Sequence, residues 1–148
     1  MPLGCLEKHG QHMPVGTDVI HITEIAKRAE EKEDVCIFPS IYFGEKTGAG
    51  EFAGTVIFSP ELRLQILKET CSEIYRNGFD KILIYDGHGG NSRMIDFFMR
   101  RLLYEKTPYS VFSYLLTVLM NLQRGEFADL LPGWQIFQIP MKATGTTV

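Results

Sequence analysis

The sequence predicts a three-layer α/β/α domain with a mainly parallel sheet. Segments typical of strands and of helices alternate along the chain, which is the order that builds a parallel sheet with right-handed crossovers. The segment 81–85 (KILIY) is dominated by an apolar run, as in a central strand that is covered on both faces. In such sheets ligands bind beyond the carboxyl ends of the strands, so the loops that follow the strands are the expected place for a site.

The other elements are predicted from local signals. Apolar residues at helical spacing indicate helices, and short apolar runs bounded by Gly or Pro indicate strands. The second helix has the clearest start, because Ser59, Pro60 and Glu61 supply a cap residue, a first-turn proline and an acid. In chain order we expect a strand tail at 2–6, a helix at 19–32, strands at 35–38 and 55–58, a helix from 59 to 78, the strand at 81–85, a helix at 92–105, a strand at 110–116, a helical segment at 115–127 and a strand at 134–139.

Length and composition limit the classes of protein. The chain has 148 residues and a formal net charge of -3, which predicts a single domain over 1–148 without a nucleic-acid partner. Its three cysteines are widely spaced, as in a reduced cytoplasmic protein rather than a zinc knuckle. The start lacks a signal-peptide pattern, and the most apolar stretch, 109–122, is too short and polar to span a bilayer. We therefore expect a cytoplasmic protein with no membrane partner.

The loop from 7 to 18 concentrates residue types that bind metals. Glu7, His9, His12 and Asp18 bring two carboxylates and two imidazoles together, and the intervening Gly and Pro residues predict a loop. If the chain is extended at Glu7 and His9, both side chains point to one face, and the later bends return Asp18 towards it. These donors suit zinc, manganese or iron. The alternative is a polar surface loop whose charges are solvated.

The second candidate segment is residues 86–91 (DGHGGN), which directly follow the clearest strand. His88 lies among glycines, where the backbone can approach another segment closely and the imidazole can reach the sheet edge. A single histidine is more often structural than a ligand, so the position of His88 decides the metal hypothesis. Asp86 and Asn91 either cap the next helix or hydrogen-bond the ligands, and for Asn91 capping is favoured.

Three segments together resemble the signatures of the creatininase (creatinine amidohydrolase) family. They are residues 3–18 (LGCLEKHGQHMPVGTD), Gly54-Thr55 and residues 86–91. The family's signatures are a Glu-x-His-Gly-x-His-x-Pro-x-Gly-Thr-Asp loop and an Asn-Gly-His-x-x-Asn loop. The resemblance extends to about residue 116, and it implies a creatininase-like α/β fold with a dinuclear metal site, usually assembled into homohexamers.

The resemblance also implies roles for individual residues. By position, Glu7 and His88 would bind one ion and His9 the other, so that the site holds up to two ions of zinc, manganese or iron. Asp18 would bridge them, since a shared carboxylate can hold two cations a few ångströms apart. The remaining polar residues of the motifs would contact the ligands or the substrate: His12, Asp86 and Asn91.

The chain departs from the family pattern at several positions. Asp86 stands where the family has Asn, and Gly90 stands where creatininase itself has a metal-binding Glu, which argues against creatinine as substrate. Gly48-Ala49 stand where many relatives have Glu-His. The family's downstream His-Ala-Gly-x-x-Glu-Thr segment, which supplies a further Glu, has no counterpart. We therefore expect a shortened member or a fragment, with a fold that is incomplete at both ends.

The leading hypothesis is a metal-dependent hydrolase that acts on a C–N bond other than a peptide bond, in a small cyclic or linear amide. A metal-activated water would attack the carbonyl, and the partners would be the small-molecule amide and further copies of the chain. One alternative is a non-catalytic anion- or nucleotide-binding α/β domain, because residues 86–91 offer backbone N–H groups at a helix N-terminus. The other is a catalytically inactive remnant of the family.

Overall fold

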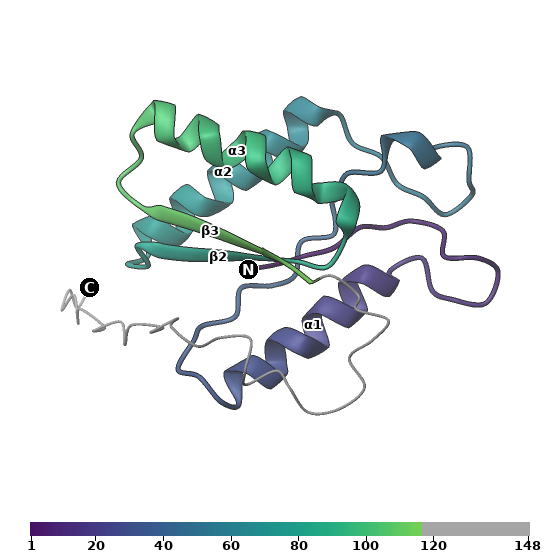
Figure 1. Cartoon of the computed structure of the whole chain (residues 1–148), viewed down its shortest axis with the longest axis horizontal. Coiled ribbons are helices and arrows are strands. Elements are labelled where there is room, and N and C mark those ends of the chain that lie inside the picture. Colours follow the sequence, from purple (N-terminus) through teal and green to yellow (C-terminus); the bar gives the residue numbers. More distant parts are fainter. Residues whose placement is uncertain (117–148) are drawn as a thin grey trace, which may run out of the picture.

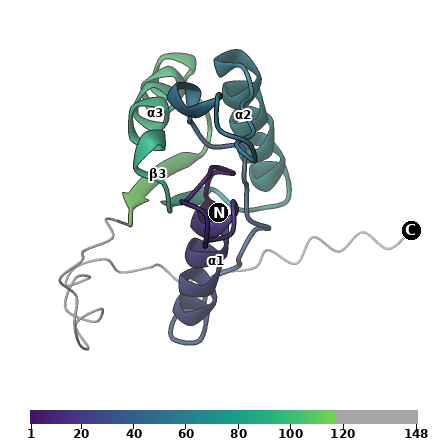
Figure 2. The same ribbon diagram turned by 90° about the vertical axis from the view of Figure 1, so that its right-hand side faces the viewer.

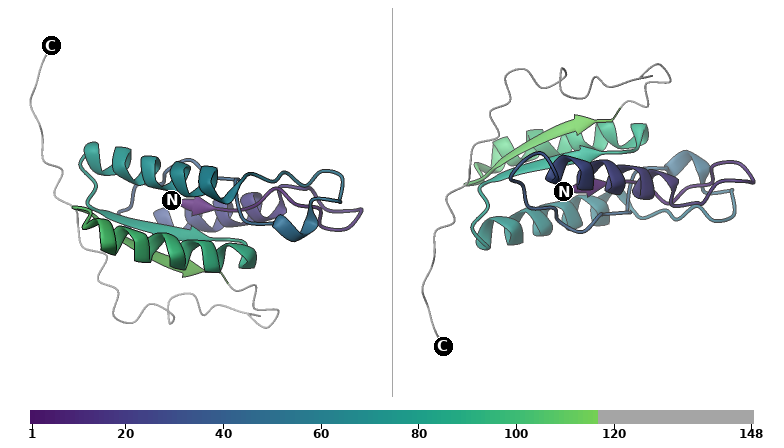
Figure 3. Two further views of the ribbon diagram at one scale, coloured as in Figure 1. Left: turned by 90° about the horizontal axis from the view of Figure 1, so that it is seen from above. Right: turned by 90° about the horizontal axis from the view of Figure 1, so that it is seen from below.

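The computed structural model describes residues 1–116, which form a parallel sheet between two layers of helices (Figure 1). One helix, α1, lies on one face of the sheet, and α2 and α3 lie side by side on the other (Figures 2 and 3). The elements are β1 (Pro2–Leu3), α1 (Thr17–Glu30), η1 (Thr47–Ala49), α2 (Pro60–Arg76), β2 (Lys81–Asp86), η2 (Gly89–Asn91), α3 (Ser92–Glu105) and β3 (Ser110–Leu115).

The three described strands are all parallel, in the order β1-β2-β3. Leu3 at the end of β1 pairs with Asp86 at the end of β2, and Asp86 pairs with Leu115 of β3. The chain therefore leaves β1 and β2 at the same edge of the sheet. This register brings the loop after β1 next to the turn after β2, as the sequence predicts.

The main core lies between the sheet and the α2–α3 layer. Side chains alternate along β2, so Ile82 and Ile84 point into this core while Leu83 stays exposed. The buried members of the core are Leu3, Ile41, Leu67, Cys71, Ile82, Ile84, Ile95, Phe98, Leu102 and Tyr109.

Helix α1 packs directly on the backbone of the sheet edge. A Cβ atom at Gly87 would lie 2.7 Å from the Cβ of Ile22, and a Cβ at Gly4 would lie 2.7 Å from the backbone nitrogen of Val19. Both values are shorter than any normal contact, so glycine is needed at each position for α1 to approach this closely. The close approach brings the first turn of α1, with Asp18, to the turn that follows β2.

Most predicted elements are confirmed. The helices expected at 19–32, from 59 and at 92–105 are α1, α2 and α3, and Ser59 caps α2 by accepting a hydrogen bond from the Leu62 backbone. The strands expected at 81–85 and 110–116 are β2 and β3. The α/β class with a parallel sheet is therefore correct for the described residues.

Two predicted strands are wrong. Residues 35–38 form no strand, and pairing begins only beyond Pro39, where Ile41 makes a parallel bridge with Leu3. Residues 55–58 make one backbone hydrogen bond to Leu6, through Val56, and extend no further along the sheet. Apolar composition misled the prediction, because Val56 is 40% exposed and contributes little to a core.

Other predictions fall partly outside the described residues. The strand expected at 134–139 and nearly all of the helical segment expected at 115–127 belong to residues that the structure does not describe. Within residues 1–116, no helix is both long and apolar enough to cross a membrane. Cys5 and Cys71 are buried, as expected for small apolar side chains, whereas Cys36 is exposed.

Candidate metal centre

Three potential metal ligands converge at the sheet edge from separate parts of the chain. Glu7 lies in the loop after β1, Asp18 in the first turn of α1, and His88 in the turn after β2. Each offers a ligand atom, and these atoms all lie within 4.8 Å of one another. Their side chains are 10%, 12% and 7% exposed, respectively. The structure thus brings together the residues that the sequence analysis singled out.

The contacts between these groups fit a cation better than they fit hydrogen bonding. His88 Nδ1 lies 2.7 Å from Asp18 Oδ2 and 3.3 Å from Glu7 Oε1. Asp18 Oδ2 is nevertheless a buried oxygen without a hydrogen-bond partner of normal geometry. An unpartnered buried carboxylate oxygen is costly, and an ion held between these atoms would remove that cost. The residues present therefore fit a divalent metal ion.

His9 approaches the same carboxylates from a different side. Its Nε2 atom lies 3.2 Å from Asp18 Oδ1 and 3.6 Å from Glu7 Oε1, and its side chain is 25% exposed. Its Nδ1 atom lies 3.1 Å from the backbone oxygen of Glu7. Because a carbonyl oxygen only accepts hydrogen bonds, Nδ1 is the donor in this contact. The two oxygens of Asp18 thus face two different imidazoles, which is the arrangement that a bridging carboxylate requires.

The turn after β2 is organised by buried hydrogen bonds around Asp86. Its Oδ1 atom accepts from the backbone N–H of His88 at 3.0 Å and from the Asn91 side chain at 2.8 Å. The Asn91 side-chain oxygen accepts from the Glu45 backbone N–H at 2.6 Å. The capping role expected for Asn91 is therefore wrong. Its backbone is already helical and its amide joins Asp86 to a different loop, so it cannot also cap α3.

Burial and neighbouring charges shift the pKa values of two groups in this turn. Burial raises the pKa of the Asp86 carboxyl above its ordinary value, and the hydrogen bonds from His88 and Asn91 only partly offset it. For His88, burial opposes the charged ring, but Asp18 and Glu7 outweigh it and raise the imidazole pKa. The His88 Nε2 atom lies 2.9 Å from the backbone oxygen of Glu45.

Sequence reasoning did not single out Glu45 and Lys46, which also contact the site. The Lys46 ammonium lies 2.8 Å from Glu7 Oε2, and this hydrogen bond raises the pKa of Lys46. Glu45 forms an ion pair with Arg63, which is buried in α2. A signal for this pair was available, because Arg63 falls in the buried stripe of α2 with Leu67, where a charge needs a partner.

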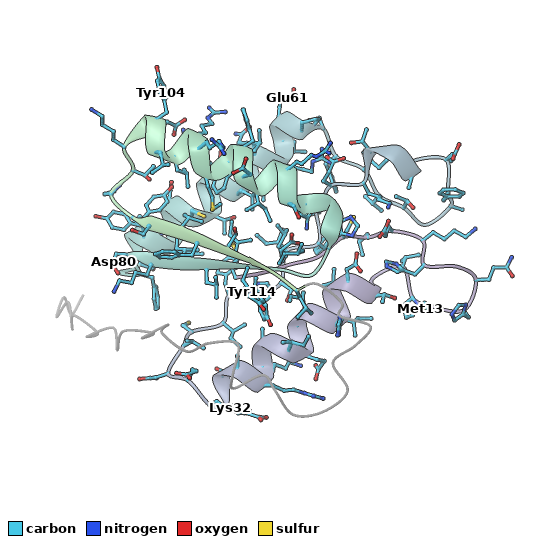
Figure 4. All side chains as sticks on the ribbon, viewed as in Figure 1. Met13, Lys32, Glu61, Asp80, Tyr104 and Tyr114 are labelled. Atoms are coloured by element: carbon cyan, nitrogen blue, oxygen red, sulfur yellow. The ribbon has the colours of Figure 1, made fainter. Side chains whose placement is uncertain are left out.

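Several other polar residues lie outside the cluster. His12, His21 and Glu51 are exposed, and no contact between His12 and the ligands occurs within residues 1–116; Figure 4 shows the neighbouring Met13 at the outer tip of its loop. Cys5 is buried beside the carboxylates, and burial, with the charges of Glu7 and Asp18, raises the pKa of its thiol to about 12. Cys5 is therefore a neutral thiol, not a ligand.

Comparison with known proteins assigns the chain to a family. The model of the creatininase family, described as creatinine amidohydrolase, matches residues 1–136. The chain belongs to the creatininase family. It is 29% identical over 113 residues to a creatinine amidohydrolase of Pseudomonas putida, covering 70% of this chain and 44% of that protein. It is also 30% identical over 101 residues to a mycofactocin precursor peptide peptidase of Mycobacterium tuberculosis (strain H37Rv). This match covers 62% of this chain and 40% of that protein.

Solved creatininase structures share the fold. A mutant creatininase of the Zn-Zn type has a TM-score of 0.67 and 27% identity, over 77% of this chain and 48% of that one. A creatininase described with Mn has a TM-score of 0.66 at the same identity. The chain thus spans less than half the length of these creatininase-family relatives. Their metals support a divalent ion at the cluster of Glu7, Asp18 and His88.

Proposed function

We propose that this creatininase-family chain is a metal-dependent hydrolase that cleaves a C–N bond in a small cyclic or linear amide. The observation that carries the proposal is Asp18. Its two oxygens face His88 and His9 separately, at 2.7 Å and 3.2 Å, at the edge of a parallel sheet. Ligand sites in such sheets lie at this edge, and a carboxylate between two imidazoles is suited to hold cations.

The roles of the residues follow from their positions. Glu7, Asp18 and His88 would hold one divalent ion, and His9 with Asp18 would hold a second. An ion bound there lowers the pKa of a coordinated water towards neutrality and polarises a carbonyl group. Lys46 holds the outer oxygen of Glu7 at 2.8 Å, so the other oxygen of that carboxylate is left to face the imidazoles.

The substrate that we propose is a small amide rather than a peptide. One creatininase-family relative is a creatinine amidohydrolase and another is a peptide peptidase, and the bond cleaved in both names is a C–N bond. The resemblance to creatininase also leads us to propose that copies of the chain associate. Light scattering of the purified protein checks this association, and a monomer at high concentration would contradict it.

The first test is metal content. The chain is purified at neutral pH, dialysed against zinc or manganese, and analysed for bound metal. We expect bound metal in the wild type and loss of most of it in Asp18→Ala. His21→Ala is the matched control, because His21 lies on the same helix and is exposed. Equal metal retention in the two variants would refute the assignment of Asp18.

The second test is turnover. The metal-loaded chain is assayed with creatinine, with formamide and with a short peptide. Hydrolysis of a small amide that is lost in Asp18→Ala and kept in His21→Ala supports the proposal. Hydrolysis of the peptide alone would replace the proposed substrate class. Metal binding without hydrolysis of any of the three would favour the inactive family remnant.

A further inference from the structure

An ion pair with a buried arginine fixes the residue whose backbone oxygen contacts His88. Arg63, on the inner face of α2, has a side chain that is only 2% exposed, and it pairs with the carboxylate of Glu45. Its other terminal nitrogen donates a long hydrogen bond of 3.5 Å to the Gly44 backbone oxygen. Burying the Arg63 charge costs free energy before its attraction to the half-buried Glu45 carboxylate is counted. Stability alone is therefore a poor explanation for this pair, and a positioning role is a better one.

Glu45 is fixed by contacts on every polar atom. Its carboxylate accepts from Arg63 through one oxygen and from the Thr47 backbone at 2.8 Å through the other. These contacts outweigh burial and keep the pKa of Glu45 below its ordinary value. Its backbone N–H donates to Asn91 at 2.6 Å, and its backbone oxygen lies 2.9 Å from His88 Nε2. The Glu45 carbonyl is thus held in place from α2 and from the turn after β2.

The position of this carbonyl determines how the His88 ring is used. A carbonyl oxygen only accepts hydrogen bonds, so the ring nitrogen that faces it, Nε2, must carry the proton. With Nε2–H on the carbonyl, Nδ1 is the nitrogen that is left for a cation; without a cation it faces only carboxylate oxygens and carries a proton itself. Nδ1 is the atom that lies 2.7 Å from Asp18 and 3.3 Å from Glu7. Histidine ligands commonly donate their second ring N–H to a backbone carbonyl, which fixes both tautomer and orientation.

We propose that Arg63 is a positioning residue for His88. Through the carboxylate and the backbone carbonyl of Glu45, it holds the His88 ring with Nε2–H on that carbonyl and Nδ1 directed at Asp18. Without Arg63, the half-buried Glu45 carboxylate loses its charge partner and moves towards solvent, and the carbonyl shifts with it. The consequence for metal binding rests on the proposed function, whereas the hydrogen bond from His88 to the Glu45 carbonyl does not.

The direct test is ¹H–¹⁵N NMR of the metal-free chain labelled with ¹⁵N, recorded at roughly pH 6, near the ordinary pKa of histidine. In the wild type we expect a resolved, slowly exchanging Nε2–H resonance of His88, because that proton is held by the Glu45 carbonyl. In Arg63→Met this resonance should be lost through fast exchange with water. Arg101→Met is the matched control, because Arg101 forms its ion pair on the exposed side of α3.

Two outcomes would overturn the proposal. One is a wild type without a slowly exchanging Nε2–H resonance of His88, and the other is an Arg63→Met variant that retains this resonance. If Arg63→Met does not fold, Arg63→Lys takes its place. Lysine keeps the charge but lacks the planar fork of guanidinium, so faster exchange of the His88 Nε2–H proton than in the wild type is expected. A folded Arg63→Lys variant with wild-type exchange would also overturn the proposal.

Zinc affinity supplies the second measurement, by competition with a chromophoric chelator. Loss of a group that orients a ligand typically weakens metal binding by about 10- to 100-fold, so this loss is expected in Arg63→Met and absent in Arg101→Met. Wild-type affinity in Arg63→Met would contradict the proposal. If the wild type itself binds no zinc, the proposed function fails, and the NMR comparison still decides the role of Arg63.

Discussion

The loop at 7–18 and the turn at 86–91 both supply metal ligands, but they hold them in different ways. In the turn, Asp86, His88 and Asn91 are 1%, 7% and 0% exposed, and buried hydrogen bonds connect them. In the loop, most residues between the ligands are exposed. The loop is closed mainly by the hydrogen bond that the Glu7 backbone N–H donates to the Val15 backbone oxygen, at 2.9 Å.

The orientations of the two imidazole rings therefore depend on the metal ion to different degrees. The turn orients the His88 ring through Glu45 before any ion binds. His9 has one side chain–backbone contact and sits near the surface, so its orientation depends more on the ion than on the protein. Changes in the turn should therefore affect both folding and metal binding, whereas changes in the loop should affect metal binding alone.

The comparison is tested most strongly by His88→Ala against His9→Ala. His88→Ala removes a buried side chain and leaves the half-buried Glu45 carbonyl without its partner, so we expect the metal-free protein to lose about 1–3 kcal/mol of unfolding free energy. It should also lose most of its bound metal. His9→Ala should lower metal content while changing stability by less than about 0.5 kcal/mol. Urea denaturation and elemental analysis measure both quantities, and equal stability losses would refute the comparison.

Gly90 and Gly89 provide a matched pair within the turn. A Cβ atom at Gly90 would lie 2.5 Å from the Glu45 backbone oxygen and 2.5 Å from His88 Nε2, whereas a Cβ at Gly89 would meet nothing within 4 Å. Gly90→Ala should therefore cost about 1–3 kcal/mol through overpacking and should weaken zinc binding. Gly89→Ala should leave both the stability and the zinc affinity nearly unchanged. A tolerated Gly90→Ala, measured by urea denaturation and zinc competition, would show that the turn is less rigid than proposed.

Asp86 gives the turn a pH dependence. Because burial raises its pKa in the folded state, the folded protein holds the proton more tightly than the unfolded chain does. Stability from this group is therefore greatest at low pH and declines as pH rises through the folded pKa. Asp86→Asn keeps an oxygen acceptor and removes the charge, so it should stabilise the metal-free protein by about 1 kcal/mol at neutral pH.

The check is urea denaturation of Asp86→Asn from about pH 4 to pH 8, across the range where a buried carboxyl titrates. The gain in unfolding free energy of Asp86→Asn over the wild type should shrink as pH falls. Asp34→Asn, at an exposed position after α1, is the control and should show no such trend. An advantage that grew towards low pH would contradict the sign of the Asp86 effect.

The smallest expected effect is on the loop side of the site. Lys46 places a positive charge 2.8 Å from Glu7 Oε2, and that charge opposes a metal ion bound by the same carboxylate. Lys46→Met should therefore tighten zinc binding by roughly fivefold, the size of a solvent-screened interaction of about 1 kcal/mol. Lys27→Met, whose ion pair lies on the exposed side of α1, is the control. Weaker zinc binding in Lys46→Met would show that Lys46 supports the ion instead.

The sequence by itself was enough for much of the fold and for the candidate ligands. Helical spacing, the Ser59-Pro60 start and the apolar run of β2 are local signals, and they predicted α1, α2, α3, β2 and β3 to within two residues at each end. The density of His, Asp and Glu in the first loop and the glycines around His88 indicated metal chemistry. These signals are readable because each depends on a few neighbouring residues.

Only the tertiary structure decided how the site is supported. Asn91 was expected to cap α3, but its amide reaches the Glu45 backbone, 46 positions away. Lys46 contacts Glu7 directly, and Arg63 is connected to His88 through Glu45. The strand expected at 35–38 is absent because pairing with Leu3 is made by Ile41 instead. Long-range packing sets these partners, and no local pattern encodes them, so the residues that orient the metal ligands appear only when the chain is folded.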